Sequence, residues 1–356
     1  MKFLFVIGLP VPYPGAAWAR IESLVNSLIN AGHQVLIIGT EKRKNLPYLV
    51  NVFLKTREAL NIPTFFITTL INILRYRPNL VIISIPPAIH ALGASLACYV
   101  SRKKMIFDYR DQWEDYLIGK AFTGIKKLAY RILKIIMTYF YLRATLIITV
   151  TPPFVDYLLK RKVKNVYLIP NGADTNLFKP VDDKKSLRIK YGLGENDFIL
   201  IYIGYVGKYY KLDVCVKSLA RHIEMDPSAR TKLLIVGEGE DVKRVFELSK
   251  LLKIEDRIIY MGVKYDKKKL AELIALADIG LIPYDKNYLW KSALSTKFFE
   301  YAACGIPIIA TVWSQSILAK IIDKEKIGMY VKPENVEELV SAISFLSSNK
   351  DFLENL

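Results

Sequence analysis

The chain has 356 residues, of which 52% are hydrophobic and 24% are charged. This length and composition favour about two globular domains with full cores, and they exclude an intrinsically disordered chain. The formal net charge of +17 indicates an anionic partner, because a field of this sign attracts phosphates. Charge alone does not choose among nucleic acid, anionic lipid and a phosphorylated small substrate.

The first half of the chain alternates β-branched runs with helical stretches. Residues 78–101 contain no Lys, Arg, Asp or Glu, but Pro86-Pro87 interrupts them, so a strand, a turn and a helix fit better than a membrane span. The apolar N-terminus is predicted to be a buried first strand rather than a signal peptide. The first helix is expected over 17–30. The expected strands are 3–7, 34–40, 80–84, 105–109 and 145–150.

A second alternation follows a polar, turn-rich segment. Strands separated by helices predict βαβ units and a parallel sheet in each half, so the fold class is α/β with two Rossmann-like domains. We expect ligands at the strand C-terminal ends, in a cleft across which the two domains face each other. The predicted divisions are a first domain at 1–168, a linker at 169–195 and a second domain at 196–356. The second set of strands is expected at 198–204, 232–239, 257–262, 279–284, 306–311 and 328–331.

Two candidate sites lie in the first half. Gly15-Ala16 opens the first helix, where exposed N–H groups and the helix dipole suit an anion; the alternative is a simple strand-to-helix turn. After the strand at 105–109, Arg110 is a candidate phosphate ligand, and Asp111 is a candidate to orient a hydroxyl or accept its proton. The alternative for this pair is a local ion pair and helix cap.

A third candidate site follows the first strand of the second half. Gly204 and Gly207 allow the backbone to approach a ligand closely. Lys208 and Lys211 are placed to set positive charge beside a pyrophosphate, and Lys208 is the better candidate. The alternative is a solvated loop with ordinary lysines.

A fourth site, in residues 289–311, is the most informative. Ser295-Thr296 is expected to begin a helix whose N–H groups bind phosphate, and Lys297 adds charge there. Glu300 lies three residues on, near the same helix face, where its carboxylate can accept both hydrogen bonds of a ribose diol. The alternative is a capped amphipathic helix.

Several common motifs are missing from the sequence. It has no Asp-x-Asp pair, no GxxxxGK[ST] and no GxGxxG at the first helix, and its few histidines and cysteines are scattered. A zinc site is improbable. We therefore expect neither a metal nor a bound cofactor.

The order of these motifs resembles the retaining GT-B glycosyltransferases of family 4, especially the branch that assembles surface polysaccharides and glycans. The resemblance covers nearly the whole chain. The matching blocks, in order, are GHQV (32–35), SIPPAIH (84–90), DYRDQW (108–113), IPNGADTNLFKP (169–180), GYVGKYYKLD (204–213), VGEGE (236–240) and STKFFEYAACGIPIIAT (295–311).

The resemblance implies roles in the second half. Glu300 matches the second Glu of the family's E-x7-E element, which holds the donor ribose, while Ser292 stands at the first Glu position. Lys208 stands where this branch has its basic residue after the second glycine. Lys211 is the candidate for the family's second lysine. The implied catalytic residues are Asp111, Lys208 and Glu300.

In the first half, Asp111 matches the family, but Arg110 replaces the His often seen before it. Gly15 matches the start of the family's Gly-rich loop, whose second glycine is Ala16 here. Family members usually continue past the position of Leu356 with a helix that crosses back to the N-terminal domain. That crossover helix is expected to be missing, whether the chain is naturally short or truncated.

The implied reaction moves a sugar from a nucleoside diphosphate sugar to an acceptor hydroxyl with retained anomeric configuration. The acceptor is expected to be a lipid-linked sugar or a glycan. The alternatives are another GT-B enzyme, such as a nucleotide-sugar 2-epimerase, and a non-catalytic nucleotide-sugar-binding protein. A nucleic-acid partner is not expected, because the charges are dispersed and no RNA- or DNA-binding motif occurs.

Two stretches suit an anionic membrane surface. Residues 124–143 mix lysines and arginines with apolar residues at helical spacing, and 62–77 form a second apolar stretch that ends in arginines. The alternative is core helices with solvated lysines. We expect a cytoplasmic protein that associates with the inner face of the cell membrane.

Overall fold

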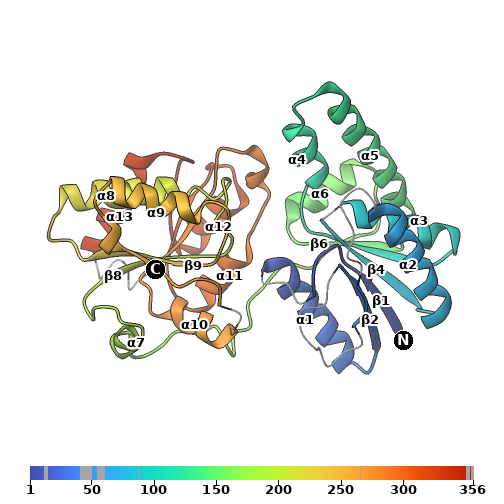
Figure 1. Cartoon of the computed structure of the whole chain (residues 1–356), viewed down its shortest axis with the longest axis horizontal. Helices are drawn as coiled ribbons and strands as arrows, with labels where there is room; N and C mark the ends of the chain where they lie inside the picture. The colour runs from blue at the N-terminus through green and yellow to red at the C-terminus, as the bar shows by residue number, and fades with distance from the viewer. Residues whose placement is uncertain are drawn as a thin grey trace. The chain divides into compact units, whose positions relative to one another are not determined.

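The computed structural model describes residues 1–11, 15–40, 50–53, 61–86, 88–264, 266–349 and 353, with only the backbone at 50–53 and 61. The chain divides into two compact units, Met1–Pro170 and Asn171–Leu356 (Figure 1). Each unit has its own sheet and hydrophobic core. Residues 12–14 of the predicted phosphate loop lie outside the described residues, as do all residues after 349 except 353.

The described part of the first unit contains a seven-stranded parallel sheet in the order β3-β2-β1-β4-β5-β6-β7. The strand order reverses between β1 and β4. Strand β1 pairs in parallel with β2 on one side and with β4 on the other. In open α/β sheets ligands bind at such a switch point, beyond the carboxyl ends of the strands. The strands are β1 (Lys2–Val6), β2 (Gln34–Gly39), β3 (Val50–Phe53), β4 (Leu80–Ile85), β5 (Met105–Tyr109), β6 (Leu146–Thr149) and β7 (Val166–Leu168).

Helices cover both faces of this sheet because side chains alternate along each strand. Leu4 and Val6 of β1 join a core cluster with α2, α3, α5 and α6. Phe3 and Phe5 join a cluster with α1 on the opposite face (Figure 1). The helices are α1 (Ala16–Asn30), α2 (Asn61–Tyr76), α3 (Ile89–Val100), α4 (Trp113–Lys120), α5 (Gly124–Arg143) and α6 (Pro152–Lys160).

The second unit contains a parallel sheet in the order β10-β9-β8-β11-β12-β13, six strands within the described residues. The order reverses between β8 and β11, so the loop after β8 lies at the switch point. The strands are β8 (Phe198–Ile203), β9 (Thr231–Val236), β10 (Ile258–Tyr260), β11 (Ile279–Pro283), β12 (Ile308–Thr311) and β13 (Gly328–Val331).

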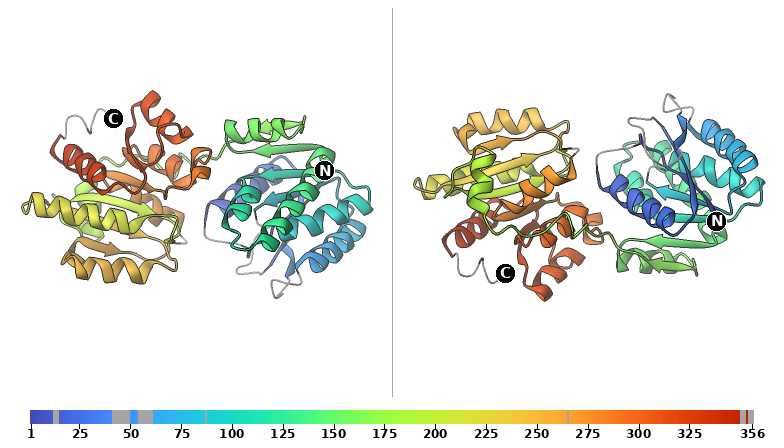
Figure 2. Two further views of the ribbon diagram at one scale, coloured as in Figure 1. Left: turned by 90° about the horizontal axis from the view of Figure 1, so that it is seen from above. Right: turned by 90° about the horizontal axis from the view of Figure 1, so that it is seen from below.

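Helices α8, α9 and α13 pack on one face of the second sheet, and α10, α11 and α12 on the other (Figure 1). Figure 2 shows the strands of this unit enclosed by helices. The elements are α7 (Lys184–Lys190), α8 (Leu212–Met225), α9 (Val242–Leu251), α10 (Lys267–Ala275), α11 (Thr296–Ala303), α12 (Ile317–Glu325) and α13 (Val336–Ser348), with short 3-10 turns at Glu255–Arg257 and Tyr288–Lys291.

The prediction of two parallel-sheet domains is confirmed, and every predicted strand is present. The uncharged stretch 78–101 forms β4 and α3, as predicted. Two short strands, β3 and β7, were not predicted. The segment predicted as a linker contains α7, whose Arg188 binds the carboxylate of Asp278 at 2.8 Å and the carbonyl of Leu276 at 3.0 Å. This helix is therefore fixed to the second unit.

Candidate functional site

The strongest candidate for an anion site is the start of α11. Ser295 is its N-cap residue, and the buried Ser295 Oγ has no hydrogen-bond partner within the described part of the chain. The geometry of an α-helix leaves its first N–H groups without intrahelical acceptors, and the helix dipole makes this end positive. Ser295 and Thr296 therefore lie where the sequence predicts a phosphate-binding turn.

Lys297, in the first turn of α11, points into the unit. Its side chain is buried, with Nζ 4.1 Å from the ring centroids of both Tyr202 and Tyr210. Burial lowers the pKa of the Lys297 ammonium to about 7, and the carboxyl of Glu300 opposes that change. The sequence spacing predicts a cation here, but it does not reveal that the ammonium lies between two aromatic rings.

Glu300 lies one helical turn after Lys297 and is half-buried. Burial raises the pKa of the Glu300 carboxyl to about 7, while the positive charges of Lys297 and Lys267 act in the opposite direction. A carboxylate that has lost part of its hydration to burial binds hydrogen-bond donors strongly, because they replace the bonds that it has lost to water. This environment suits the predicted contact with a diol.

The loop after β8 is held by the loop after β9. The Gly204 N–H donates to the Val236 carbonyl at 2.9 Å. A Cβ at Gly237 would lie 1.8 Å from the Gly204 carbonyl oxygen, so the two backbones meet directly. Gly204 has a φ of +114°, and a Cβ there would lie 3.6 Å from Lys297 Nζ. Gly204 therefore covers the buried ammonium of Lys297.

The two predicted lysines of this loop have different surroundings. Lys208 is exposed. Lys211 precedes α8 and lies 3.8 Å from the carboxylate of Glu334, which partly balances its charge. Gly207 is buried, and a Cβ there would lie 2.5 Å from the ring of Tyr205. Lys208 is thus the more available of the two cations for a ligand.

An aromatic cluster beside this loop was not predicted. The rings of Tyr284 and Trp290 stack with centroids 4.3 Å apart, and the Tyr210 ring packs against both. The Trp290 indole N–H donates to Asp285 at 2.6 Å. The cluster fixes the Tyr210 ring that contacts Lys297. Its signal in the sequence is the aromatic residues at 209–210, 284, 288 and 290.

In the first unit, a buried ion pair joins α1 to β5. Arg20 Nε donates to Asp108 at 2.8 Å, and Arg20 also donates to the carbonyl of Ile169 at 2.8 Å. Ser84 donates to the other carboxylate oxygen of Asp108 at 3.0 Å. These residues were also missed, although an Asp within a predicted buried strand is a recognisable signal, since buried charges need partners.

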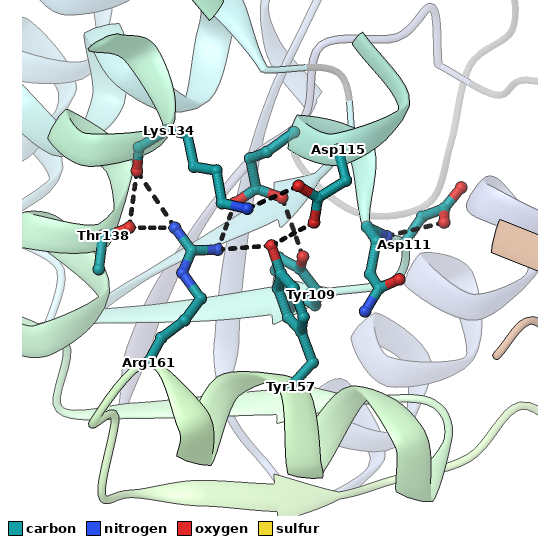
Figure 3. Close-up of polar contacts among 9 residues, drawn as sticks. Tyr109, Asp111, Asp115, Lys134, Thr138, Tyr157 and Arg161 are labelled. Atoms are coloured by element: carbon teal, nitrogen blue, oxygen red, sulfur yellow. Dashed lines mark hydrogen bonds and ion pairs between the residues drawn. The ribbon is translucent and has the colours of Figure 1, made fainter. Parts of the chain in front are cut away.

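The predicted pair Arg110 and Asp111 follows β5 directly. The Arg110 guanidinium donates to Ser84 Oγ at 3.1 Å and to the Pro86 carbonyl. The Asp111 carboxylate accepts the Gln112 N–H at 2.8 Å and lies apart from the neighbouring polar cluster (Figure 3). Burial raises the pKa of the Asp111 carboxyl to about 6, and Arg110 opposes this. Arg110 is largely occupied by local bonds, whereas Asp111 keeps acceptor capacity.

That polar cluster ties α4, α5 and α6 together (Figure 3). The buried Glu114 accepts from Tyr109 at 2.9 Å and from Arg161 at 3.0 Å. Asp115 accepts from Lys134 at 2.6 Å and from Tyr157 at 2.7 Å. Most of these side chains are at least partly shielded from water, so the pairs hold α5 in a defined position rather than contributing only weak surface contacts.

The remaining predicted residues, Gly15 and Ala16, begin α1. Gly15 is the N-cap residue, and its carbonyl accepts the N–H groups of Trp18 and Ala19 at 3.1 Å. The predicted residues thus form two groups. Gly15, Ala16, Arg110 and Asp111 lie in the first unit, while Gly204, Gly207, Lys208, Lys211, Ser295, Thr296, Lys297 and Glu300 lie in the second. Among the residues that the structure describes, no three His, Cys, Asp or Glu side chains form a metal-binding group.

Two family models match the chain, and together they span most of it. "Glycosyltransferase Family 4" matches residues 17–177, and "Glycosyl transferases group 1" matches residues 183–356. The chain belongs to glycosyltransferase family 4. The two matches fall on the two structural units, which divide at Pro170.

Solved structures show the same fold. The sucrose-phosphate synthase from Thermosynechococcus elongatus aligns with a TM-score of 0.74 and 19% identity over 99% of this chain and 91% of that one. HepE from Anabaena, in complex with UDP and glucose, aligns with a TM-score of 0.75 and 16% identity over 99% of this chain and 92% of that one. These alignments establish the GT-B fold that the sequence predicts.

Among curated proteins, the chain is similar to N-acetyl-alpha-D-glucosaminyl L-malate synthase from Bacillus anthracis. The two are 34% identical over 149 residues, which is 42% of this chain and 36% of that protein. The chain spans between about a third and a half of the length of the first curated relatives that it matches.

The raised pKa of Glu300 predicts a pH-dependent effect of the Glu300→Gln substitution on stability. The Glu300 carboxyl binds its proton more tightly in the folded state than in the unfolded state. Its protonation therefore favours the folded state fully below pH 4.5, and this stabilisation is lost as the pH rises through about 7. Glu300→Gln should therefore raise the melting temperature of the unligated protein at pH 8 and change it little at pH 4.5. About 1 kcal/mol corresponds to about 2–4 °C for a unit of this size.

Differential scanning calorimetry of both proteins at the two pH values measures the effect. Glu247→Gln is the control, because Glu247 is an exposed carboxylate on α9 of the same unit. A Glu300→Gln protein that is equally stabilised at both pH values, or destabilised at pH 8, contradicts the prediction.

Proposed function

We propose that this chain is a retaining glycosyltransferase that moves a sugar from a nucleoside diphosphate sugar to an acceptor hydroxyl without a metal. The observation that carries the proposal is the start of α11, where the helix N-terminus, Lys297 and Glu300 come together under the loop of Gly204. The diphosphate and the ribose of a nucleoside diphosphate each have a complementary group there. The second unit is the donor side, and the first unit is the acceptor side.

The departing diphosphate is the group that most needs stabilisation. As the glycosidic bond breaks, negative charge grows on the diphosphate and positive charge grows on the sugar. Lys208 and the N–H groups at Ser295 and Thr296 are positioned on one unit to receive that negative charge, and preorganised donors of this kind lower the barrier. Lys211, 3.8 Å from Glu334, supplies a weaker positive field. Glu300 holds the ribose diol.

The acceptor side is assigned to the loop after β5. Asp111, with its pKa raised to about 6, is largely ionised at neutral pH and retains capacity to accept a hydrogen bond. We assign it the role of orienting the acceptor hydroxyl. In a front-face reaction the leaving phosphate takes the acceptor proton, so Asp111 need not become protonated. Arg110, bonded to Ser84 and Pro86, keeps this loop in place.

The relatives support a sugar-nucleotide donor. The HepE structure contains UDP and glucose, and other relatives are named as glycosyltransferases or as synthases of glycosylated products. A nucleotide-sugar 2-epimerase would bind the same donor but convert it without an acceptor. A non-catalytic binding protein would bind the donor and leave it unchanged.

A screen of nucleoside diphosphates and their sugars by thermal shift tests the donor site. A ligand that binds the native state stabilises it by about 2.7 kcal/mol at a concentration one hundred times Kd, and this raises the melting temperature. We expect one base to be preferred. Glu300→Ala should weaken binding by about 10- to 100-fold, because hydrogen bonds to a charged group contribute about 1.5–3 kcal/mol.

Glu247→Ala, at an exposed position on α9, is the matched control and should bind like the wild type. No shift from any compound at millimolar concentration, with the protein folded, would sink the donor assignment. For the preferred donor, product analysis then separates transfer to an acceptor from epimerisation and from binding alone.

We further propose that the acceptor is lipid-linked and that the first unit binds the anionic inner face of the cell membrane. Helices α2, α3 and α5 pack on the same face of the first sheet. Their outer sides expose many large apolar residues, and Lys126, Lys127 and Arg131 lie among those on α5. The exposed apolar residues are Ile67, Ile71, Leu74, Tyr99, Val100, Phe122, Ile125, Leu128, Ile132, Ile135, Ile136, Tyr139 and Leu142.

An exposed helix with both apolar and basic residues binds anionic lipid by burial of its apolar face and by attraction of its cations. Phe122, just before α5, and Ile125, in its first turn, are 101% and 84% exposed, so a protein core does not account for them. The polar cluster of Figure 3 fixes α5 against α4 and α6 in this orientation. Among the described residues, no helix has the length and apolarity needed to cross a bilayer.

Co-sedimentation with vesicles tests this surface. We expect binding to vesicles that contain anionic lipid, weaker binding as salt rises, and none to purely zwitterionic vesicles. The double variant Phe122→Ser/Ile125→Ser should lose most of the binding. Ile189→Ser, at an exposed isoleucine on α7 of the second unit, is the control and should bind normally. Equal binding by all three proteins, or no binding by the wild type, contradicts the membrane proposal.

A further inference from the structure

We infer that Lys297 is a proton-linked cation of the donor site, which takes up a proton when the diphosphate of a sugar nucleotide binds at Gly204 and the start of α11. This inference rests on the proposed donor site and deepens it. It makes donor affinity depend on pH through one buried amine.

The geometry isolates the Lys297 amine from water but leaves it close to the ligand surface. The residue is 5% exposed, and Nζ has no hydrogen-bond partner within the described residues. Nζ lies 4.1 Å from the ring centroids of Tyr202 and Tyr210, and a Cβ on Gly204 would be 3.6 Å from it. A ligand on the outer side of Gly204 is therefore separated from the amine by little more than the backbone.

This environment balances the neutral and charged forms of the amine. A buried ammonium with three donors and no acceptor is costly, although two aromatic faces recover part of that cost. Burial brings the pKa of Lys297 to about 7, so the amine is mostly neutral at pH 8 in the free protein. A diphosphate placed nearby adds negative charge in a poorly solvated site, which raises the pKa of the amine again.

At pH 8 the other titratable groups around Lys297 are either neutral or already mostly ionised. Burial raises the pKa of the Cys215 thiol on α8 to about 12 and holds the pKa of the Tyr202 phenol on β8 well above its usual value, so both are neutral at pH 8. Glu300, one turn along α11, has a pKa of about 7 and also feels Lys267 of α10. At pH 8 Glu300 is mostly ionised already, so proton exchange there reports on Lys297. Below pH 7, ionisation of Glu300 on binding would release a proton instead.

Isothermal titration calorimetry at pH 8, in two buffers with different ionisation enthalpies, measures the proton exchange. The probes are UDP-glucose, GDP-mannose and ADP-glucose, whose diphosphate groups do not titrate near neutral pH. The tightest binder should take up close to one proton per ligand. By linkage, its Kd should rise close to tenfold between pH 8 and pH 9.

Three variants separate the proton link from a structural role. Lys297→Met should bind more weakly, take up no proton and lose the pH dependence. Lys297→Arg should bind without proton uptake and with a Kd that is flat between pH 8 and pH 9, because a guanidinium stays charged. Lys208→Met removes an exposed cation of the adjacent loop, so it should weaken binding while the proton uptake remains.

The outcomes distinguish this inference from the function on which it rests. Binding of a sugar nucleotide with no proton uptake at pH 8, or with uptake that persists in Lys297→Met, overturns the proton link and leaves the donor site in place. Failure of all three sugar nucleotides to bind the folded wild type overturns both. Circular dichroism and the melting temperature of each variant verify that it is folded, and proton uptake by the wild type tests the link even where a Lys297 variant does not fold.

Discussion

The burial of two opposite ionisable groups at the start of α11 is the constraint on which the second unit depends. Lys297 and Glu300 both have pKa values near 7, because the low dielectric of their surroundings disfavours each charge. These two buried groups lie where a helix N-terminus, a glycine loop and an aromatic cluster meet. Because burial disfavours the Lys297 ammonium, an anion bound beside it would stabilise that charge.

In the first unit, two buried opposite charges are paired directly. Arg20 and Asp108 are both buried, but they form an ion pair, and Ser84 and the Ile169 carbonyl take the remaining bonds. This arrangement fixes α1 to the ends of β4, β5 and β7, and it places Asp111 beside a rigid strand end. The paired charges Arg20 and Asp108 are therefore structural, whereas Asp111 keeps the capacity to accept further hydrogen bonds.

Much of the fold and part of the site follow from sequence pattern. Short continuous runs of apolar residues predict the strands of both sheets, because the strands of a buried parallel sheet are apolar on both faces. The spacing from Ser295 to Glu300 predicts a helix start with a cation and a carboxylate on one face. The direction of Lys297 between Tyr202 and Tyr210 was not predictable, since it depends on contacts between α11, β8 and the loop that follows it. The Arg20–Asp108 pair was missed for the same reason: its members are 88 residues apart. The strand β7 is short and largely exposed, so no buried apolar run marks it in the sequence.

The most direct test of the donor-site assignment is a crystal structure of the chain with its tightest-binding nucleoside diphosphate. If the assignment is right, the diphosphate lies against the N–H groups at Ser295 and Thr296 and over Gly204, and the ribose diol donates to the Glu300 carboxylate. Lys208 is then within reach of a phosphate oxygen. A nucleotide bound elsewhere, with the Glu300 carboxylate and the start of α11 left in contact with solvent, would contradict the assignment and with it the role proposed for Lys297.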